Sequence, residues 1–357
     1  MRLSRQFWLG LAVSLAFSAL FFYRVDLRKM ASALAGANYL YLLPAIAAYF
    51  AAVLFRTWRW KYLLAPMRPI PLARLFPVVV VGYMANNLLP ARLGEVVRSY
   101  YLGQREGVSA TSALATVVVE RVYDGLALLF LLAVTALFLP VAGLVGQLSQ
   151  STHLPAWLLS AVGVAPFLAV MVALVGASLY PGKALWVGQQ LARPLPLRWR
   201  ARAMHLGVRF IEGLHVLRSP RRLVTVFLWS LPVWLSEAAM YYVLALSFGL
   251  EGAFATLGMM AAGILMVTAI SNLATSLPSS PGAVGPFEFF GAATLVFLGA
   301  ERGVASAYAV ALHIALLAPV TLAGLVYLWL ENLSLSQLAK RSQSQRVVLP
   351  DAGNDER

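Results

Sequence analysis

The 357-residue sequence contains no cysteine and few charged residues. The absence of cysteine excludes disulfide bonds and metal sites with thiolate ligands. The sequence also lacks a nucleophile elbow, a Walker loop, a metal-spaced histidine cluster and a nucleotide-binding fingerprint. These absences argue against ATP-driven transport within this chain, and we expect no metal site, no cofactor and no catalytic residues of these kinds.

Apolar residues dominate what is present. Hydrophobic residues make up 61% of the chain and the mean hydropathy is +0.77, a composition typical of a polytopic membrane protein. Six stretches are long enough to cross a bilayer, which takes about 20 helical residues: 7–23, 39–55, 111–139, 156–180, 222–248 and 304–330. We interpret the first as a retained span, because no small-residue cleavage site follows it. We therefore expect residues 1–333 to form one all-α transmembrane domain. We expect the polar residues 334–357 to form a disordered tail.

The formal net charge of +14 could suggest a nucleic-acid partner, but the basic residues lie between the apolar stretches. Lys and Arg in such loops mark the cytoplasmic side of a membrane, where lipids are anionic. Their distribution places both termini in the cytoplasm if residues 75–104 enter and leave on one side. We therefore expect a plasma (inner) membrane protein whose partners are anionic or zwitterionic phospholipids, possible homo-oligomerisation, and no nucleic acid.

Two further apolar regions, 75–104 and 254–299, are each interrupted by a polar break. The breaks 86–95 and 272–288 both run from Asn through Leu-Pro and Gly to Glu. Polar backbone at membrane depth is tolerated where it is buried in protein or lines a wet cavity. We expect two re-entrant or broken hairpins that enter from opposite sides, in an inverted-topology repeat of residues 1–140 and 156–333. The same spacing of 25 residues from Glu95 to Glu120 and from Glu288 to His313 is consistent with such a repeat.

The first break offers a site for an anion. Free amide groups at the start of a helix bind anions, and an arginine such as Arg92 can bind phosphate through two parallel hydrogen bonds. The predicted binding residues here are Asn87, Arg92, Glu95 and Arg98. In a simpler alternative, Arg92 and Glu95 pair only to close the hairpin.

A second group of predicted binding residues, Glu120, Arg121 and Asp124, lies within the third predicted span. Arg121 can reach Asp124 at i, i+3 on a helix. Each charge costs on the order of 2.5–3.5 kcal/mol at the centre of a membrane, so three together imply mutual pairing or a polar cavity. Alternatively, this part of the chain lies near the inner surface. Upstream, Arg56 and Arg59 stand beside Trp58 and Trp60, and we interpret these arginines as interface anchors.

The second break and the later spans supply the remaining candidates. The predicted binding residues are Asn272, Ser279, Ser280, Gly282, Gly285 and Glu288. The glycines resemble a phosphate loop only superficially, because the lysine is missing. Glu237 and His313 lie alone within predicted spans and could couple transport to protons, although His313 could equally be a hydrogen-bonded core histidine.

The basic loop 181–222 contains apolar residues at helical spacing between arginines. They are Trp199, Ala203, Leu206, Phe210, Leu214 and Leu217. This pattern predicts an interfacial helix in the inner headgroup layer. In the alternative interpretation, the segment is an ordinary basic loop that only sets topology.

At these residues the sequence resembles the transmembrane, flippase-like domain family of lysylphosphatidylglycerol synthase. The matching motifs are Asn87-x-Leu89-Pro90-x-Arg92-x-Gly94-Glu95, Glu120-Arg121-x-x-Asp124, Pro281-Gly282-x-x-Gly285-x-x-Glu288 and, upstream, Arg56-x-x-Arg59-Trp60. The resemblance runs to about Leu330 and implies movement of lipids between leaflets. The soluble synthase domain that accompanies it in the family is absent from this sequence.

Three functions remain open at this point. The favoured function is a lipid transporter in which the acidic residues neutralise a headgroup or carry protons. A membrane transferase acting on a lipid-linked donor would use Glu95 or Asp124 as general base. A scaffold for other envelope proteins would use the basic loop 181–222.

Overall fold

The chain, described by a computed structural model, is built from helices. The structure describes residues 5–23, 25–89, 93–139, 155–194, 196–277 and 279–331, with positions 143, 146, 149 and 150. No β-strand occurs within these ranges, which confirms the all-α class for them. Arg92 and the tail 334–357 lie outside the described residues.

The helices follow the chain in this order. The first half contains α1 (Arg5–Tyr23), α2 (Leu27–Gly36), α3 (Leu42–Leu64), α4 (Leu72–Leu88), α5 (Leu93–Glu106) and α6 (Ala110–Thr135). The second half contains α8 (Ala156–Leu179), α9 (Pro181–Leu191), α10 (Leu197–Gly213), α11 (Pro220–Ser247), α12 (Leu257–Ala274), α13 (Pro286–Phe297) and α14 (Arg302–Leu330). Short 3₁₀ helices are η1 (Tyr39–Tyr41), η3 (Leu214–Arg218), η4 (Leu250–Ala253) and η5 (Pro281–Ala283).

The described residues contain four to six candidate membrane spans. Four segments are long and apolar enough alone: Tyr39–Leu64, Pro220–Ser247, Leu257–Ala274 and Arg302–Leu330. Two pairs qualify only together, since α1 and α2 bend by 88° and α8 and α9 by 113°. α6 occupies the predicted span 111–139 but carries three charged residues in its middle. The coarse prediction of a polytopic membrane protein is therefore confirmed.

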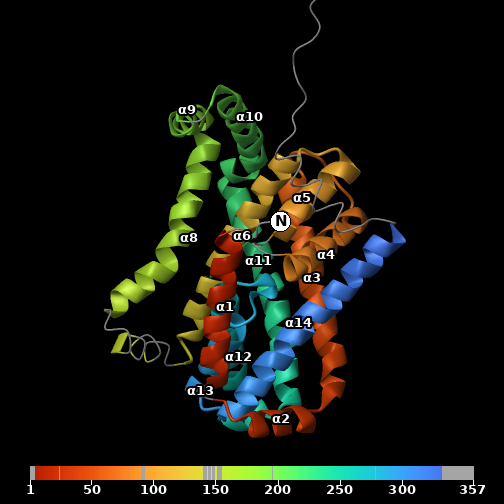
Figure 1. Cartoon of the computed structure of the whole chain (residues 1–357), viewed down its shortest axis with the longest axis vertical. Helices are drawn as coiled ribbons and strands as arrows, with labels where there is room; N and C mark the ends of the chain where they lie inside the picture. Colours follow the sequence, from red (N-terminus) through yellow and green to blue (C-terminus); the bar gives the residue numbers. More distant parts are fainter. Residues whose placement is uncertain are drawn as a thin grey trace, which may run out of the picture.

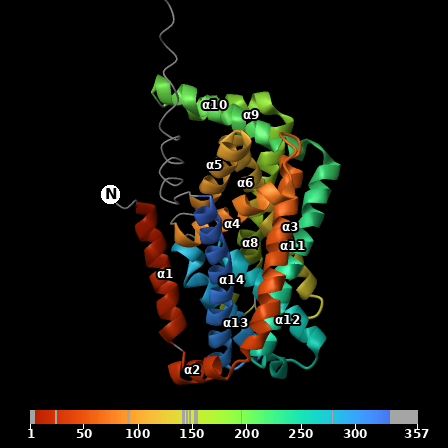
Figure 2. The ribbon, with the colours of Figure 1, turned by 90° about the vertical axis from the view of Figure 1, so that its right-hand side faces the viewer.

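The long helices run along the long axis of the molecule, and short helices lie across its ends (Figure 1). α3 packs along α11, and α14 packs on α4. α9 and α10 cover one end of the bundle and α2 covers the other (Figure 2). α8 leans away from the bundle and exposes apolar side chains such as Leu168 and Val172, as expected for a helix that faces lipid.

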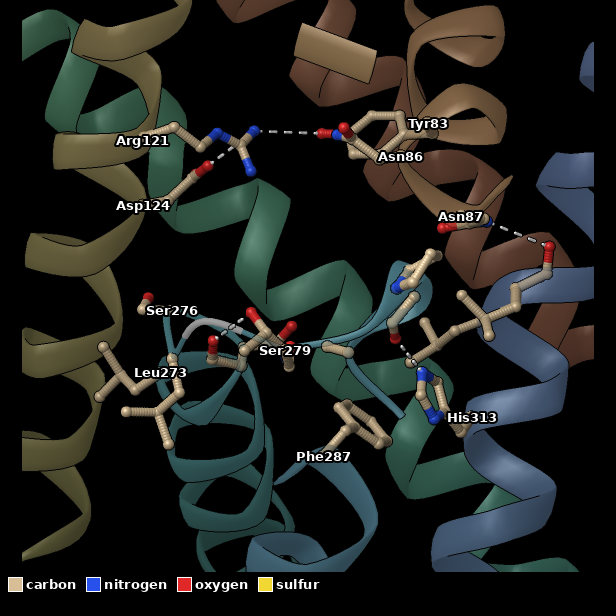
Figure 3. Close-up of a pocket in the computed structure, with 18 of the residues that line it drawn as sticks. Tyr83, Asn86, Asn87, Arg121, Asp124, Leu273, Ser276, Ser279, Phe287 and His313 are labelled. Atoms are coloured by element: carbon tan, nitrogen blue, oxygen red, sulfur yellow. Dashed lines mark hydrogen bonds and ion pairs between the residues drawn. The ribbon is translucent and has the colours of Figure 1, made fainter. Parts of the chain in front are cut away.

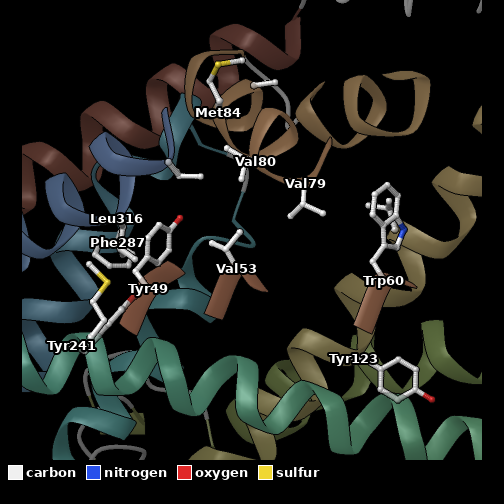
Figure 4. Close-up of a cluster of buried hydrophobic side chains, with 14 of the residues drawn as sticks. Tyr49, Val53, Trp60, Val79, Val80, Met84, Tyr123, Tyr241, Phe287 and Leu316 are labelled. Atoms are coloured by element: carbon white, nitrogen blue, oxygen red, sulfur yellow. The ribbon is translucent and has the colours of Figure 1, made fainter. Parts of the chain in front are cut away.

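Buried apolar side chains join α3, α4, α11 and α14 in one core (Figure 4). All four valines 78–81 of α4 are buried, because α3, α5 and α14 pack around this helix. A helix buried on all sides needs no amphipathic period. Trp60 donates its indole N–H to Thr116 at 3.0 Å, so its polar edge is satisfied within the core. This core fixes the position of both polar breaks.

Helices end at both breaks, as the Pro and Gly residues predict. Asn86 and Asn87 occupy the last turn of α4, and the second break continues from α12 through η5 to α13. Gly282 and Gly285 have φ angles of 72° and 99°, a region that glycine adopts without the steric cost of a Cβ atom. Because η5 contacts α4, the two breaks lie against each other inside the bundle.

The helix predicted within the basic loop is α10. Its apolar side chains do not share one environment, because Leu214 and Leu217 are buried against the bundle whereas Trp199 and Leu206 are exposed. The reason is that the α-helix changes to the 3₁₀ helix η3 at Leu214, which alters the direction of the following side chains. The helix is confirmed, but its apolar residues do not form a single face.

Candidate functional site

A cavity of about 880 Å³ lies where the two breaks meet (Figure 3). Its walls come from α3, α4, α6, α11, α12, the second break and α14, with contributions from α1 and α8. Ten predicted residues line it: Asn87, Glu95, Arg121, Asp124, Glu237, Asn272, Ser279, Ser280, Gly282 and His313. The structure therefore brings together polar groups from both halves of the chain.

Arg59 is the centre of a charge cluster behind one wall. Its Nη1 donates to Asp124 Oδ1 at 2.8 Å and to Ser230 Oγ at 2.7 Å. Its Nη2 lies 3.7 Å from Glu120 Oε1, and the side chain is fully buried. A buried charge is tolerated when it is paired and hydrogen-bonded. Because a buried charge without its partner is costly, these contacts hold α3 against α6 and α11.

Arg56, one turn before Arg59, bonds Glu237 on α11 through its Nη2. Its Nη1 lies 3.8 Å from Asp124 Oδ2, and its guanidinium carbon lies 4.5 Å from the centre of the Trp234 ring. The interpretation of Arg56 and Arg59 as interface anchors is therefore wrong. α3 continues beyond both residues, and they are only 5% and 0% exposed. Glu237, which has no charged neighbour in sequence, finds its partner across the bundle.

Arg98 and Glu120, two of the predicted binding residues, lie behind the cavity wall rather than on it. Arg98 Nη2 lies 2.8 Å from Glu120 Oε2, and the guanidinium carbon lies 3.6 Å from the centre of the Trp60 ring. Neither residue lines the cavity, and both side chains are buried. Their role in this structure is to support the wall.

Arg121 and Glu95 are the charged pair most open to the cavity within the described cluster. Arg121 Nη2 lies 3.1 Å from Asp124 Oδ2, which confirms the predicted i, i+3 pair. Its Nε is 3.8 Å from Glu95 Oε1, and its Nη2 donates a long hydrogen bond of 3.4 Å to Tyr83 Oη. The two side chains are 29% and 20% exposed. Because this contact is long and partly open, an incoming ligand could replace it at little cost.

The opposite wall presents amide and hydroxyl groups. Asn272 in the last turn of α12 donates to the Thr268 carbonyl at 3.0 Å, and Ser276 and Ser279 follow it toward the cavity (Figure 3). Asn87 on α4 donates to Thr321 Oγ1 on α14 at 3.0 Å. These neutral groups can bind a ligand without adding charge.

His313 on α14 and Glu288 on α13 form a clasp around the second break. The Nδ1 atom of His313 is 2.5 Å from Glu288 Oε1, and its Nε2 atom is 2.8 Å from the Gly282 carbonyl oxygen. Since a carbonyl only accepts, Nε2 carries a proton. The Gly285 N–H donates to Glu288 Oε2 at 2.8 Å. The clasp therefore holds both glycines in place, and of these four residues Glu288 and Gly285 do not line the cavity.

The two halves share one pairing pattern. A glutamate in the first turn after each break meets a cationic or titratable group on the next long helix: Glu95 meets Arg121, and Glu288 meets His313. The spacing of 25 residues thus corresponds to a contact in the second half. In the first half the partner of Glu95 is one residue beyond Glu120.

α1 packs on the second break through small residues, a contact that the sequence reasoning missed. The Ser280 N–H donates to Ser14 Oγ at 2.8 Å. A Cβ atom on Gly285 would lie 2.6 Å from the Ser14 carbonyl oxygen, and one on Gly10 would lie 2.8 Å from that of Ser279. The spacing of Gly10 and Ser14 by four residues is the signal for such close packing in a membrane.

Other lining residues were also missed by sequence reasoning. They include several leucines and, among aromatic and amide side chains, Tyr49, Tyr83, Asn86, Trp234 and Phe287. Nothing in their local sequence separates them from ordinary core residues. Within the described ranges no group of three His, Asp or Glu residues is placed to hold a metal ion.

Comparison with known proteins gives consistent matches. The family model described as lysylphosphatidylglycerol synthase TM region matches residues 7–324. A UPF0104 membrane protein of Methanothermobacter thermautotrophicus is 25% identical over 276 residues, which cover 73% of this chain and 76% of the relative. The glycosyltransferase AglD of Haloferax volcanii is 24% identical over 331 residues, which cover 85% of this chain and 50% of that protein. No solved structure matches the chain.

Proposed function

Because this chain belongs to the family of the lysylphosphatidylglycerol synthase TM region, we propose that it is an integral membrane lipid transporter. It moves a phospholipid or a lipid-linked headgroup between the two leaflets. The observation that carries the proposal is the cavity of about 880 Å³, whose polar lining lies inside a bundle of four to six candidate spans. Charged and polar groups are costly at membrane depth, and where they line a cavity they typically mark the path of a polar substrate.

The headgroup enters the cavity while the acyl chains remain in the bilayer. Its phosphate takes the place of Glu95 beside Arg121, and Arg92 together with the backbone amides at the start of α5 binds the remaining oxygens. The clasp of Glu288 and His313 can carry a proton and so couple the second break to the state of the cavity. Rocking of the two halves about this site alternates its access.

We further propose that α4–α5 and α12–α13 are re-entrant hairpins of an inverted repeat. The end of the bundle with α9 and α10 faces the cytoplasm, as do both termini, and α9–α10 lies in the inner headgroup layer of the plasma membrane. The basic residues of the 181–222 segment and the exposed Trp186 and Trp199 support this orientation.

Lipid exchange in proteoliposomes tests the proposal. Phospholipids labelled on headgroups of differing charge are combined with a quencher confined to the outside. We expect accelerated exchange that is lost in Arg92→Ala and falls at least tenfold in Arg121→Gln, because both remove phosphate ligands. Arg74→Gln is the matched control, since Arg74 is exposed and does not line the cavity. Normal exchange by well-folded Arg92→Ala and Arg121→Gln proteins would show that these arginines do not bind the phosphate. No exchange by the unmodified protein would reject transport.

A membrane transferase is the second candidate, because one relative is named a glycosyltransferase. In that function Glu95 is the better general base. Asp124 lies among Arg56, Arg59 and Arg121, which occupy both of its carboxylate oxygens, whereas Glu95 has only a distant contact with Arg121. Mass spectrometry of lipids incubated with purified protein would reveal a covalently altered species, and unchanged lipids would count against this function.

A further inference from the structure

We propose that the headgroup bound in the cavity is a glycosyl phosphate, in which one phosphodiester carries a sugar. The sugar phosphate could be attached to a polyprenol or to a glycerolipid, and both share the chemistry recognised here. This inference rests on the proposed transport function and narrows its substrate class. It follows from the charge balance, the free hydroxyl groups and the size of the cavity.

The first argument is that the described cluster carries no surplus charge. Four guanidinium groups face four carboxylates through the pairs already described: Arg56, Arg59, Arg98 and Arg121 against Glu95, Glu120, Asp124 and Glu237. An ammonium group would have to compete with Arg121 for Glu95, and a multiply charged anion would leave several carboxylates without partners. Among ligands that contain phosphate, one with a single charge and otherwise neutral polar groups disturbs this balance least.

The second argument is that hydroxyl groups on both walls remain free within the described structure. Tyr49 on α3, and Ser276 and Ser279 after α12, line the cavity, and their hydroxyl groups make no hydrogen bond to described residues. A hydroxyl group both donates and accepts. Phosphate oxygens only accept and ammonium groups only donate, so neither satisfies these groups fully. The hydroxyl groups of a sugar do both.

The third argument concerns shape. The cavity has the volume of sites that enclose drug-sized ligands, roughly 300–1,000 Å³. A phosphate with ethanolamine or glycerol would fill only part of it. Tyr83 and Phe167, which are only partly buried, add aromatic surface to the lining, on which the apolar faces of a sugar ring can pack. Sugar hydroxyls can also donate to the Glu95 carboxylate once the phosphate has taken its place beside Arg121.

Binding to the purified full-length protein in phosphatidylcholine nanodiscs tests this assignment. The probes are a short-chain isoprenyl phosphoglucose and a phosphatidylglucose, compared with isoprenyl methyl phosphate, a sugar-free diester of the same charge, and with phosphatidylglycerol. We expect at least one glycosyl phosphate to bind roughly tenfold more tightly than its sugar-free counterpart, as the loss of a few hydrogen bonds implies. The stronger of the two probes identifies the lipid anchor.

Two variants test whether the hydroxyl groups of the cavity, rather than the stability of the fold, determine the preference for the sugar. Tyr49→Phe and Ser279→Ala should reduce the preference for the sugar several-fold, whereas Tyr39→Phe and Ser32→Ala, which change hydroxyl groups outside the cavity, should not. A preference that survives both cavity variants, or equal binding of phosphatidylglycerol, would overturn the glycosyl assignment. Lipid exchange in the vesicle assay would then still support transport, so the two proposals fail separately.

Discussion

At the scale of single residues, the site depends on matched buried charges. Arg59 satisfies Asp124 and Ser230 directly and faces Glu120, while its own side chain is fully buried. A buried pair contributes little net stability against a well-packed apolar pair, but loss of one partner leaves the other buried and unpaired. Arg59 is therefore a structural requirement of the cavity wall.

Replacing Arg59 by methionine should lower the free energy of unfolding by about 3–5 kcal/mol, because the buried Asp124 Oδ1 loses its hydrogen-bond donor and Glu120 loses one of its two cationic partners. Thermal unfolding in detergent measures the effect. The matched control is Arg74→Met, in which the arginine is 62% exposed and 3.6 Å from Glu106. Surface pairs of this kind contribute about 0–1 kcal/mol, so equal losses in the two variants would contradict the argument.

Single residues also show what the sequence could predict. The Arg121–Asp124 pair follows from helical spacing, and the positions of Gly282 and Gly285 mark the second break. The bonds of Arg56 and Arg59 could not be predicted, because their partners lie on other helices. Beside tryptophans near the end of an apolar run, both arginines have the local pattern of interface anchors.

At the scale of elements, α8 packs against α6 at a glycine, where the missing side chain leaves space for an aromatic ring. Gly125, next to Asp124, has the ring of Phe167 directly over its backbone, and a Cβ atom there would lie 2.0 Å from Phe167 Cε1. Both residues line the cavity. Pro166 precedes Phe167 within α8 and removes one backbone hydrogen bond, so the helix can bend there. The space left by the missing side chain of Gly125 thus sets how closely α8 packs over the cavity.

Gly125→Ala should destabilise the protein by about 1–3 kcal/mol, because the added methyl group displaces Phe167. Gly176→Ala on α8 is the control, since its Cβ would meet nothing within 4 Å and alanine favours a helix. Unfolding of the double variant Gly125→Ala, Phe167→Ala should show strong non-additivity. Additive effects would mean that the two side chains do not compete for the same space.

The ends of elements were easier to predict than their depth in the membrane. The Pro and Gly residues place both breaks correctly, and helical spacing predicts α10. The second predicted span stops short of Leu64, because charged residues lower the local hydropathy although the helix continues. Similarly, the charges in α6 are compensated by residues of other helices, a contribution that a hydropathy average does not contain.

At the scale of the whole molecule, the absence of cysteine makes topology directly measurable. We expect Ala73→Cys, Gln104→Cys and Gln189→Cys to be labelled from the cytoplasmic side and Ser32→Cys from the outside. These positions are exposed at the start of α4, near the end of α5, on α9 and on α2. A membrane-impermeant maleimide applied to intact and opened cells measures each side. Labelling of Ala73→Cys and Gln104→Cys from opposite sides would reject a re-entrant α4–α5.

The long-range pairing of Arg56 and Arg59 also constrains how the protein is made. Asp124 follows Arg59 by 65 residues, and Glu237 follows Arg56 by 181. α3 therefore leaves the ribosome with two unneutralised guanidinium groups, each costing on the order of 2.5–3.5 kcal/mol at the centre of a bilayer. We expect α3 to integrate stably only after α6 and α11 have been synthesised. Alkali should extract a nascent chain arrested before residue 110 more readily than one arrested after residue 250, and equal retention would show that α3 inserts without its partners.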